Sequence, residues 1–366
     1  MRFPRQLLTM TAKAHLPPRD PNNHPLKVIN RINATENRPA YIAGPMVRYS
    51  KLPFRELVRH FAVDIVYTPM ILAREFVRNQ TARDSDFTTN EKDTPTIAQF
   101  GANNALDLVR AVELIKPYVD GIGLNCGCPI KEQVREGIGA ALMESPEKVA
   151  EMVRAVKSAF GADFCVEVKI RIHKDLNDTV RYAQMVEAAG ADYLTVHGRT
   201  KTQRSREAAD FDAIRLVKQS VKIPVVANGD AFSLDDAHRI AEYTGCNGVM
   251  AVRGILSNPA LFAGYTSTPW HAIEIFWDLV TAYGLPYRLT QHHLSEMLEG
   301  NVSKADKRDM NEQKNLAELI EWFDARFELR RFNEPGFGED RSEYPWRKSA
   351  VKAAVSDEDK TAAWYD

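Results

Sequence analysis

Between residues 40 and 265, short runs rich in β-branched side chains alternate with segments of helical periodicity. Parallel strands need a long crossover connection, usually a helix, so this alternation predicts β/α units that share one parallel sheet. We expect eight strands, at 40–43, 64–68, 96–100, 121–124, 164–170, 193–196, 225–227 and 248–252. We expect helices between most of them, at 104–115, 146–159, 178–189, 211–219 and 233–243.

Eight strands over this length match a (β/α)8 barrel, the TIM barrel. A doubly wound open sheet is the alternative fold. That fold carries a glycine-rich dinucleotide loop after its first strand. The expected first strand is instead followed by Gly44-Pro45-Met46-Val47-Arg48. We therefore predict the α/β class with a TIM barrel.

The chain outside the barrel divides into three parts. Residues 1–39 carry seven Lys/Arg, two acidic residues and six prolines, which predicts a basic, mostly irregular arm. Residues 266–331 place apolar side chains at helical spacing, for example between Ile273 and Val280, and predict a small all-helical domain. Residues 332–366 predict a polar tail. Three roles are open for the arm: a mobile tail, an RNA contact, or a mitochondrial transit peptide.

Composition limits the classes of partner. The 48 basic residues face 49 acidic ones, so any contact with RNA must come from local patches. Four cysteines are too few and too scattered for a disulfide framework, which favours a reducing compartment. No run reaches the roughly 18 consecutive apolar residues of a spanning helix, so we expect no membrane partner.

Polar or glycine-rich residues follow seven of the eight expected strands. In a TIM barrel the active site lies at the carboxyl ends of the strands. The seven signals are Gly44-Pro45-Met46-Val47-Arg48, Gln99, Asn125-Cys126-Gly127-Cys128-Pro129, Lys169 with Arg171, His197-Gly198-Arg199, Asn228-Gly229-Asp230 and Arg253-Gly254. Seven signals in register are not expected by chance, so they predict one site at that end of the barrel.

The last two signals predict a phosphate site. Gly229 and Gly254 allow a close approach of the backbone, and Arg253 supplies a bidentate donor. The loops after strands seven and eight of such barrels often bind phosphate. Ordinary turn glycines are the alternative for either loop alone.

Three further side chains have a chemical and a structural interpretation. Lys169 is either a cation that stabilises negative charge on a bound ring or part of a salt bridge. His197 is either a ligand contact or a satisfied buried histidine. Cys128 is either a general acid towards a substrate carbon or a structural thiol. Cys126 and Cys128 form only C-x-C, and no second pair has metal spacing, so we expect no metal.

Six cations beside the expected barrel mouth form a possible grip for the phosphates of a large anionic substrate. A solvated charged surface is the alternative. The six are Arg199, Lys201, Arg204, Arg206, Lys131 and Arg135. In the helical region, His292 and His293 are expected at the surface.

Five segments between residues 40 and 265 resemble, in order and spacing, the motifs of the tRNA-dihydrouridine synthase family. They are Ile42-Ala43-Gly44-Pro45-Met46-Val47-Arg48 with Leu52-Pro53-Phe54-Arg55, Leu124-Asn125-Cys126-Gly127-Cys128-Pro129, Val168-Lys169-Ile170-Arg171, Val196-His197-Gly198-Arg199-Thr200 and Ala227-Asn228-Gly229-Asp230. The first segment, continued through Tyr49-Ser50-Lys51-Leu52, is most similar to the eukaryotic branch that acts on D-loop uridines 20a and 20b.

The resemblance implies an FMN-dependent enzyme that reduces uridine to 5,6-dihydrouridine in tRNA, with NADPH as the reductant. Reduced flavin would pass hydride to C6 of a flipped-out uridine, and Cys128 would give a proton to C5. A base must leave its stack to reach a buried cofactor. The alternatives are a flavoenzyme acting on a free pyrimidine and a non-catalytic tRNA-binding protein.

By position, the resemblance also assigns the cofactor contacts. Pro45, Met46 and Val47 would line the flavin, Gln99 would hydrogen-bond the ring, Lys169 would offset charge at its N1/O2 edge, and His197 would contact the cofactor. The ribityl phosphate end would be held by Asn228, Gly229, Asp230, Val252 and Arg253. Many relatives carry glycine where this chain has Val252.

The helical domain corresponds in place to the family's tRNA-binding module. Its acidic residues outnumber its basic ones, so RNA affinity would rest on the mouth loops and the basic arm. We expect a monomer in the cytoplasm, the nucleus or both, with the mitochondrion a weaker alternative.

Overall fold

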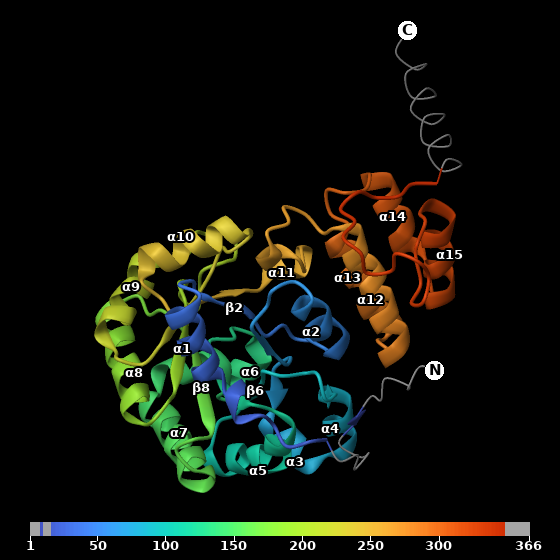
Figure 1. Cartoon of the computed structure of the whole chain (residues 1–366). Helices are drawn as coiled ribbons and strands as arrows, with labels where there is room; N and C mark the ends of the chain where they lie inside the picture. Colours follow the sequence, from blue (N-terminus) through green and yellow to red (C-terminus); the bar gives the residue numbers. More distant parts are fainter. Residues whose placement is uncertain (1–7, 10–15, 348–366) are drawn as a thin grey trace.

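The computed structural model describes residues 8–9 and 16–347. At its centre, eight parallel strands form a closed barrel (Figure 1). The strands are β2 (Ala40–Ala43), β3 (Ile65–Tyr67), β6 (Thr96–Gly101), β7 (Gly121–Cys126), β8 (Cys165–Arg171), β9 (Tyr193–His197), β10 (Val225–Asn228) and β11 (Gly248–Ala251). Each pairs with the next in this order, and β11 pairs with β2 to close the circle. The predicted TIM barrel is confirmed, and each expected strand is present with its ends shifted by at most two residues.

Helices cover the outside of the barrel (Figure 1). The main ones are α2 (Leu52–Arg59), α3 (Ala73–Arg78), α5 (Ala105–Ile115), α7 (Pro146–Phe160), α8 (Leu176–Ala188), α9 (Phe211–Ser220) and α10 (Leu234–Thr244). The shorter elements are β1 (Leu8–Thr9), β4 (Ile71–Leu72), β5 (Thr88–Thr89), α4 (Gln80–Asp86), α6 (Lys131–Arg135), α11 (Arg253–Ser257) and the 3-10 turns Pro21–Asn23, Lys116–Tyr118, Gly139–Glu144 and Leu261–Ala263. Local signals set several helix starts: Pro146 occupies the first turn of α7, and the Ser233 side chain accepts the N–H of Asp236 to cap α10.

Side-chain alternation along each strand divides the core into two clusters. On β8, Val166, Val168 and Ile170 pack outward among the helices. Cys165 belongs to the second cluster, inside the barrel. Because successive strand residues face opposite sides, Glu167 and Lys169 share the inward face with Cys165.

Helix α1 (Pro25–Thr35) corrects the prediction of an irregular arm. Its Val28, Ile29 and Ile32 are buried in the cluster inside the barrel, so the helix covers the amino-terminal end of the strands. The prolines obscured this helix, but Pro25 lies in its first turn, where a missing N–H costs nothing. Residues 1–7 and 10–15 of the arm lie outside the described residues.

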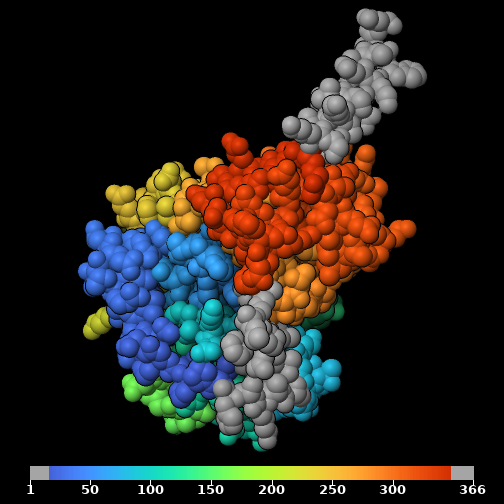
Figure 2. Space-filling view, turned by 45° about the vertical axis from the view of Figure 1, so that its right-hand side comes forward, coloured from blue at the N-terminus to red at the C-terminus, as the bar shows by residue number. Residues whose placement is uncertain are grey.

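Four helices follow the barrel and pack beside it (Figures 1 and 2). They are α12 (Trp270–Tyr283), α13 (Tyr287–Met297), α14 (Lys304–Glu312) and α15 (Leu316–Arg326). The prediction that His293 is at the surface is wrong. Its ring is fully buried against Phe54 of α2 and Phe276 of α12, and its Nε2 lies 3.2 Å from the carbonyl oxygen of Tyr49. His293 therefore joins the helical region to the barrel.

The segment after residue 331 folds back onto the helical region, so the expected polar tail is not free as far as residue 347. Trp346 forms an antiparallel bridge with Phe327, and their ring centroids lie 4.4 Å apart. The other expected anchor, Trp364, lies outside the described residues. Among the helices described, none combines the length and apolar character needed to cross a bilayer.

Candidate active site

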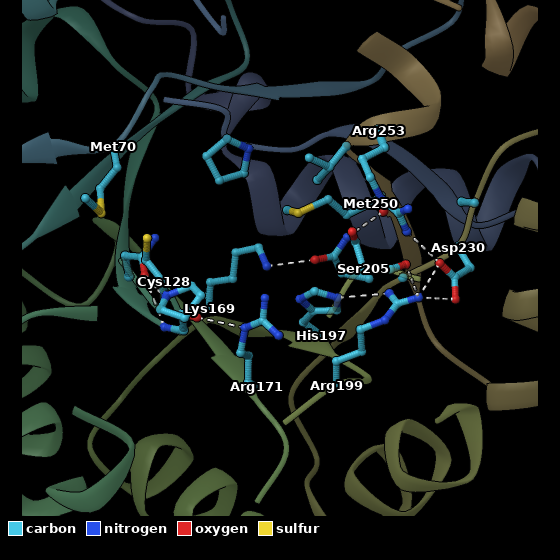
Figure 3. Close-up of a pocket in the computed structure, with 18 of the residues that line it drawn as sticks. Met70, Cys128, Lys169, Arg171, His197, Arg199, Ser205, Asp230, Met250 and Arg253 are labelled. Carbon is cyan, nitrogen blue, oxygen red and sulfur yellow. Dashed lines mark hydrogen bonds and ion pairs between the residues drawn. The ribbon is translucent and has the colours of Figure 1, made fainter. Parts of the chain in front are cut away.

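A cavity of about 300 Å³ opens at the carboxyl ends of the barrel strands (Figure 3). It gathers candidate residues that lie far apart in the sequence. Its lining includes Pro45, Val47, Gln99, Cys128, Lys169, His197, Arg199, Asn228, Gly229, Asp230, Val252 and Arg253. The polar signals after separate strands thus meet in one pocket, as the fold predicts.

The Cys128 loop is held by hydrogen bonds on both sides. The Asn125 side-chain oxygen accepts the backbone N–H groups of Gly127 at 3.1 Å and Cys128 at 2.9 Å. The N–H of Ala140 donates to the Cys128 carbonyl oxygen at 2.8 Å. Gly139 has a φ of +65°, and a Cβ there would lie 2.6 Å from the same carbonyl oxygen. The thiol therefore sits on a fixed loop whose neighbouring turn requires glycine.

The electrostatic setting of Cys128 suits a proton donor. Burial raises the pKa of the thiol, and the N–H of Ile130 and the cations Arg171 and Lys169 offset only part of that rise. The thiol therefore keeps its proton at neutral pH and can donate it. Cys126 differs: it is fully buried in the core and does not line the cavity, which fits its expected packing role.

Lys169 points into the barrel mouth rather than out to the helices (Figure 3). Its Nζ donates to Oδ1 of Asn228 at 2.7 Å, and Asn228 donates in turn to the Met250 carbonyl oxygen at 2.9 Å. Burial, together with the nearby cations Lys169 and Arg171, lowers the pKa of His197 to about 2. His197 is therefore a neutral imidazole at physiological pH, able to donate one hydrogen bond and accept another.

The predicted phosphate loops form one cluster around Asp230. Its carboxylate accepts hydrogen bonds from Arg199 at 2.5 Å and from Arg253 at 2.8 Å. Gly229 has a φ of +139°, and a Cβ there would lie 2.6 Å from that of Ala209. Gly254 packs directly against the Ala231 carbonyl oxygen. Two guanidinium groups share one carboxylate, which leaves an excess positive charge for an anion.

The structure separates Arg199 from the other predicted tRNA contacts. Arg199 is 2% exposed and belongs to the Asp230 cluster, because its guanidinium turns inward from the loop. The exposed cations are Lys201, Arg204, Arg206, Lys131 and Arg135. Lys201 pairs with Glu144 at 2.6 Å. A contact of these five with tRNA stays a prediction.

Met46 also lies elsewhere than predicted. Its side chain is buried in the core beneath the loop after β2, and only its neighbours Pro45 and Val47 line the cavity. In a tight loop, successive side chains point in different directions, so a three-residue motif does not deliver three contacts.

Three residues in or below the pocket were not predicted from the sequence. Met70 lines the cavity after β3, the strand end without a polar signal. Phe232 also lines it, 47% exposed, with the Arg253 guanidinium 5.0 Å from its ring centroid. Glu167 lies in the barrel interior below Lys169. An acidic residue inside a buried strand run, Cys165–Arg171, was the signal that could have revealed it.

Comparisons with known proteins show the family to which this chain belongs. The family model for dihydrouridine synthase (Dus) matches residues 41–356, and the chain belongs to this family. The tRNA-dihydrouridine(20a/20b) synthase (NAD(P)+) of Saccharomyces cerevisiae is 53% identical over 320 residues, which is 86% of this chain and 87% of that one. The Schizosaccharomyces pombe enzyme of the same name is 51% identical, over 88% of this chain and 97% of that one. A human protein named as tRNA-dihydrouridine(20a/20b) synthase-like is 45% identical, over 77% and 89%.

The residues present fit a bound flavin. Gln99 is 1% exposed and lines the cavity, and within the described residues its Nε2 has no hydrogen-bond partner. Its Oε1 accepts from Asn125 at 2.9 Å, so the free N–H group is aimed by that contact. A buried donor without a partner is costly unless a ligand satisfies it. A Cβ on Gly44 would lie 2.7 Å from Val252 Cγ2, so the backbone at Gly44 packs tightly against Val252 and has no room for a side chain.

The described residues do not form a metal site. Across residues 8–9 and 16–347, no cluster of three or more His, Cys, Asp or Glu side chains could hold a metal ion.

Proposed function

We propose that this protein reduces uridine to 5,6-dihydrouridine at positions 20a and 20b of the tRNA D-loop, with FMN as its flavin and NADPH as reductant. The observation that carries the proposal is a protonated thiol, a buried lysine and a paired-arginine anion site gathered in one barrel mouth of a dihydrouridine synthase.

FMN fits the spacing of the site. Cys128 and Asp230 lie on opposite sides of the pocket, with Lys169 and His197 between them (Figure 3). Flavin mononucleotide has one isoalloxazine ring system and one phosphate group, and the pocket offers one region suited to each. Arg199 and Arg253, oriented by the Asp230 carboxylate, would receive the phosphate, and Gln99 and Lys169 would contact the ring.

FMN held in this pocket and reduced by NADPH would supply the hydride needed at C6 of the uridine. Cys128 would give its thiol proton to C5, which would leave its sulfur as a thiolate. Arg171 and Lys169 already act on the Cys128 charge, so they stabilise that thiolate until a proton from solvent restores the thiol.

The substrate base must leave its stack to reach this pocket. Exposed cations lie in two segments next to pocket-lining residues, Lys131 and Arg135 on α6 and Lys201, Arg204 and Arg206 after β9. They would hold the tRNA backbone while the base enters.

The test uses purified protein, FMN, NADPH and tRNA from a strain that lacks dihydrouridine. Mass mapping should show a gain of two hydrogens at uridines 20a and 20b. Cys128→Ala should slow this gain by about 100-fold or more, the usual contribution of a positioned acid. Cys246→Ala, which removes a buried thiol outside the pocket, is the control and should keep wild-type activity.

Two results would contradict the proposal. One is no gain in mass from folded, flavin-loaded protein. The other is equal activity on free uracil, which would indicate a small-molecule reductase.

A further inference from the structure

Glu167 is a buried acid that neither the proton donor nor the phosphate cluster uses. It lies on β8 with no exposed surface, two positions before Lys169 and on the same inward face. A cluster of buried side chains fills the barrel interior below the mouth, among them Ile97, Tyr67 and Tyr193. A carboxyl group in such a place is costly unless something offsets its desolvation.

The carboxyl group is poorly satisfied. Within the described residues, neither of its oxygens has a hydrogen-bond partner of good geometry. The Thr195 and Tyr67 hydroxyls are the neighbouring donors that lower its pKa, and the Tyr67 hydroxyl also lies 2.7 Å from the Tyr193 hydroxyl. Gly123 on β7 makes room for the carboxyl, because a Cβ there would lie 2.5 Å from Glu167 Oε2. The barrel thus accommodates an acid at this place without neutralising it by direct pairing.

Lys169 lies above this acid and is turned away from it. Its Nζ donates to Asn228 at the mouth, and its side chain is half-buried and lines the cavity. Burial lowers the pKa of Lys169, and Glu167 is the main group that opposes this fall. Burial likewise raises the pKa of Glu167 well above its usual range, which the Thr195 hydroxyl and Lys169 oppose.

Few other groups near this pair change charge close to neutral pH. The groups that interact electrostatically with Glu167 are Tyr67 on β3, Cys126 on β7, Cys165 on β8 and Tyr193 on β9, and burial raises the pKa of each well above neutrality. The groups that act on Lys169 besides Glu167 are the permanent cation Arg171, the Cys128 thiol and the neutral His197. Once it loses its proton, Glu167 is therefore the negative charge that these neighbours offer to Lys169.

We propose that Glu167 is a positioning residue for the flavin site. As pH rises from neutral into the mildly alkaline range, its carboxyl group gives up its proton before the Lys169 ammonium group does, and the resulting carboxylate keeps Lys169 charged. A direct ion pair would draw the ammonium down into the barrel. Separated charges attract through the low-dielectric interior while Nζ stays at the mouth. The inference rests on the proposed flavin site, because the ammonium group is then presented to the ring.

The test is the dissociation constant of FMN measured between pH 7 and pH 10 by fluorescence. Wild-type protein should bind tightly until Lys169 loses its proton. Glu167→Gln removes the negative charge at nearly constant shape, so this loss of affinity should begin about one pH unit lower or more. The Lys169→Met variant should bind FMN weakly and show no such loss of affinity with pH, which would assign that loss to the deprotonation of Lys169.

Two variants control the comparison. Tyr193→Phe alters the same layer without changing a charge and should keep the wild-type profile. Glu167→Asp keeps the charge but draws it back by one methylene, so its step should lie between those of wild type and Glu167→Gln, and it gives a second test if the Gln variant does not fold.

A step in Glu167→Gln or Glu167→Asp at or above the wild-type pH overturns the inference while leaving the flavin site intact. Wild-type protein that binds no FMN at any pH contradicts the proposed function, and the inference falls with it.

Discussion

Asp93 and Glu167 are both carboxyl groups buried near cations, and their two sites are built differently. Asp93, in the loop before β6, accepts hydrogen bonds from Arg55 at 2.6 Å, Thr96 Oγ1 at 2.9 Å and Thr89 Oγ1 at 3.0 Å. Glu167, inside the barrel, has no partner of that quality in the described part of the chain, and its neighbour Lys169 bonds to an amide instead.

The difference in hydrogen bonding reverses the electrostatic result. Burial alone would raise the pKa of Asp93, but the guanidinium of Arg55 and its hydrogen bonds outweigh burial and hold that pKa well below its usual range. Burial dominates at Glu167 and raises its pKa well above its usual range. A carboxylate saturated with donors holds α2 to the barrel; an unsaturated one remains able to influence a ligand site.

The largest expected effect is a loss of folding stability when Asp93, the carboxylate with many hydrogen-bond donors, is replaced. Asp93→Asn should lower the free energy of unfolding by about 3–5 kcal/mol, because it leaves Arg55 buried without its counter-charge. Urea denaturation measures this. The exposed Asp178→Asn, which pairs only with Arg181 on the helix surface, should cost under about 1 kcal/mol. A similar loss in both variants would remove the distinction between the sites.

At the unsaturated site the expected loss is in binding rather than stability. Lys169→Met should weaken FMN binding by about 10- to 100-fold, equivalent to about 1.4–2.8 kcal/mol, and leave the free energy of unfolding equal or higher. Isothermal titration and urea denaturation measure the two quantities. Lys157→Met is the matched control. Lys157 pairs with Asp192 at 2.6 Å outside the pocket, so its loss should destabilise the fold and spare FMN binding.

The two acids should also give opposite slopes of stability against pH. The folded-state pKa of Asp93 is lowered, so its contribution is present above the unfolded-state value of 3.8 and is lost as pH falls below it. The folded-state pKa of Glu167 is raised, so its contribution is fully present below the unfolded-state value of 4.5 and is lost as pH rises from there through the raised folded-state value.

Denaturation at several pH values separates these slopes. Asp93→Asn should flatten the acid slope alone, and Glu167→Gln should flatten only the fall that begins above pH 4.5. If Asp93→Asn changed the neutral slope, the two sites would not be independent.

The smallest effect on stability is expected at the exposed cations of the mouth. Replacing Lys201, Arg204 and Arg206 together by Gln should change the free energy of unfolding by under about 1 kcal/mol. The same variant should weaken tRNA binding and reduce its dependence on salt by about two units of log–log slope. Filter binding at several salt concentrations measures this.

The matched control replaces Arg31, Arg181 and Lys222, which are exposed away from the mouth. Equal weakening by both triple variants would show a general charge effect rather than a tRNA-binding surface.

The path of the backbone could be predicted from the sequence more fully than the positions of individual side chains. The barrel strands and the carboxyl-end signals could be predicted, because β/α periodicity and the direction of parallel strands are local properties. Arg199 could not be placed correctly: it stands in a run of surface cations, and only the loop geometry turns it towards Asp230. Likewise, His293 is next to the exposed His292, yet Phe54 and Tyr49 of the barrel bury it.

The sequence by itself determined the barrel, the membership of its strands and the end at which the chemistry lies, since each follows from spacing along the chain. Only the tertiary structure decided that helix α1 covers the barrel base, that Arg199 and Arg253 share Asp230, and that Glu167 lies unsatisfied beneath Lys169. The reason is physical: burial and hydrogen bonding fix what a charged side chain does, and both are set by residues that the fold brings from elsewhere in the chain.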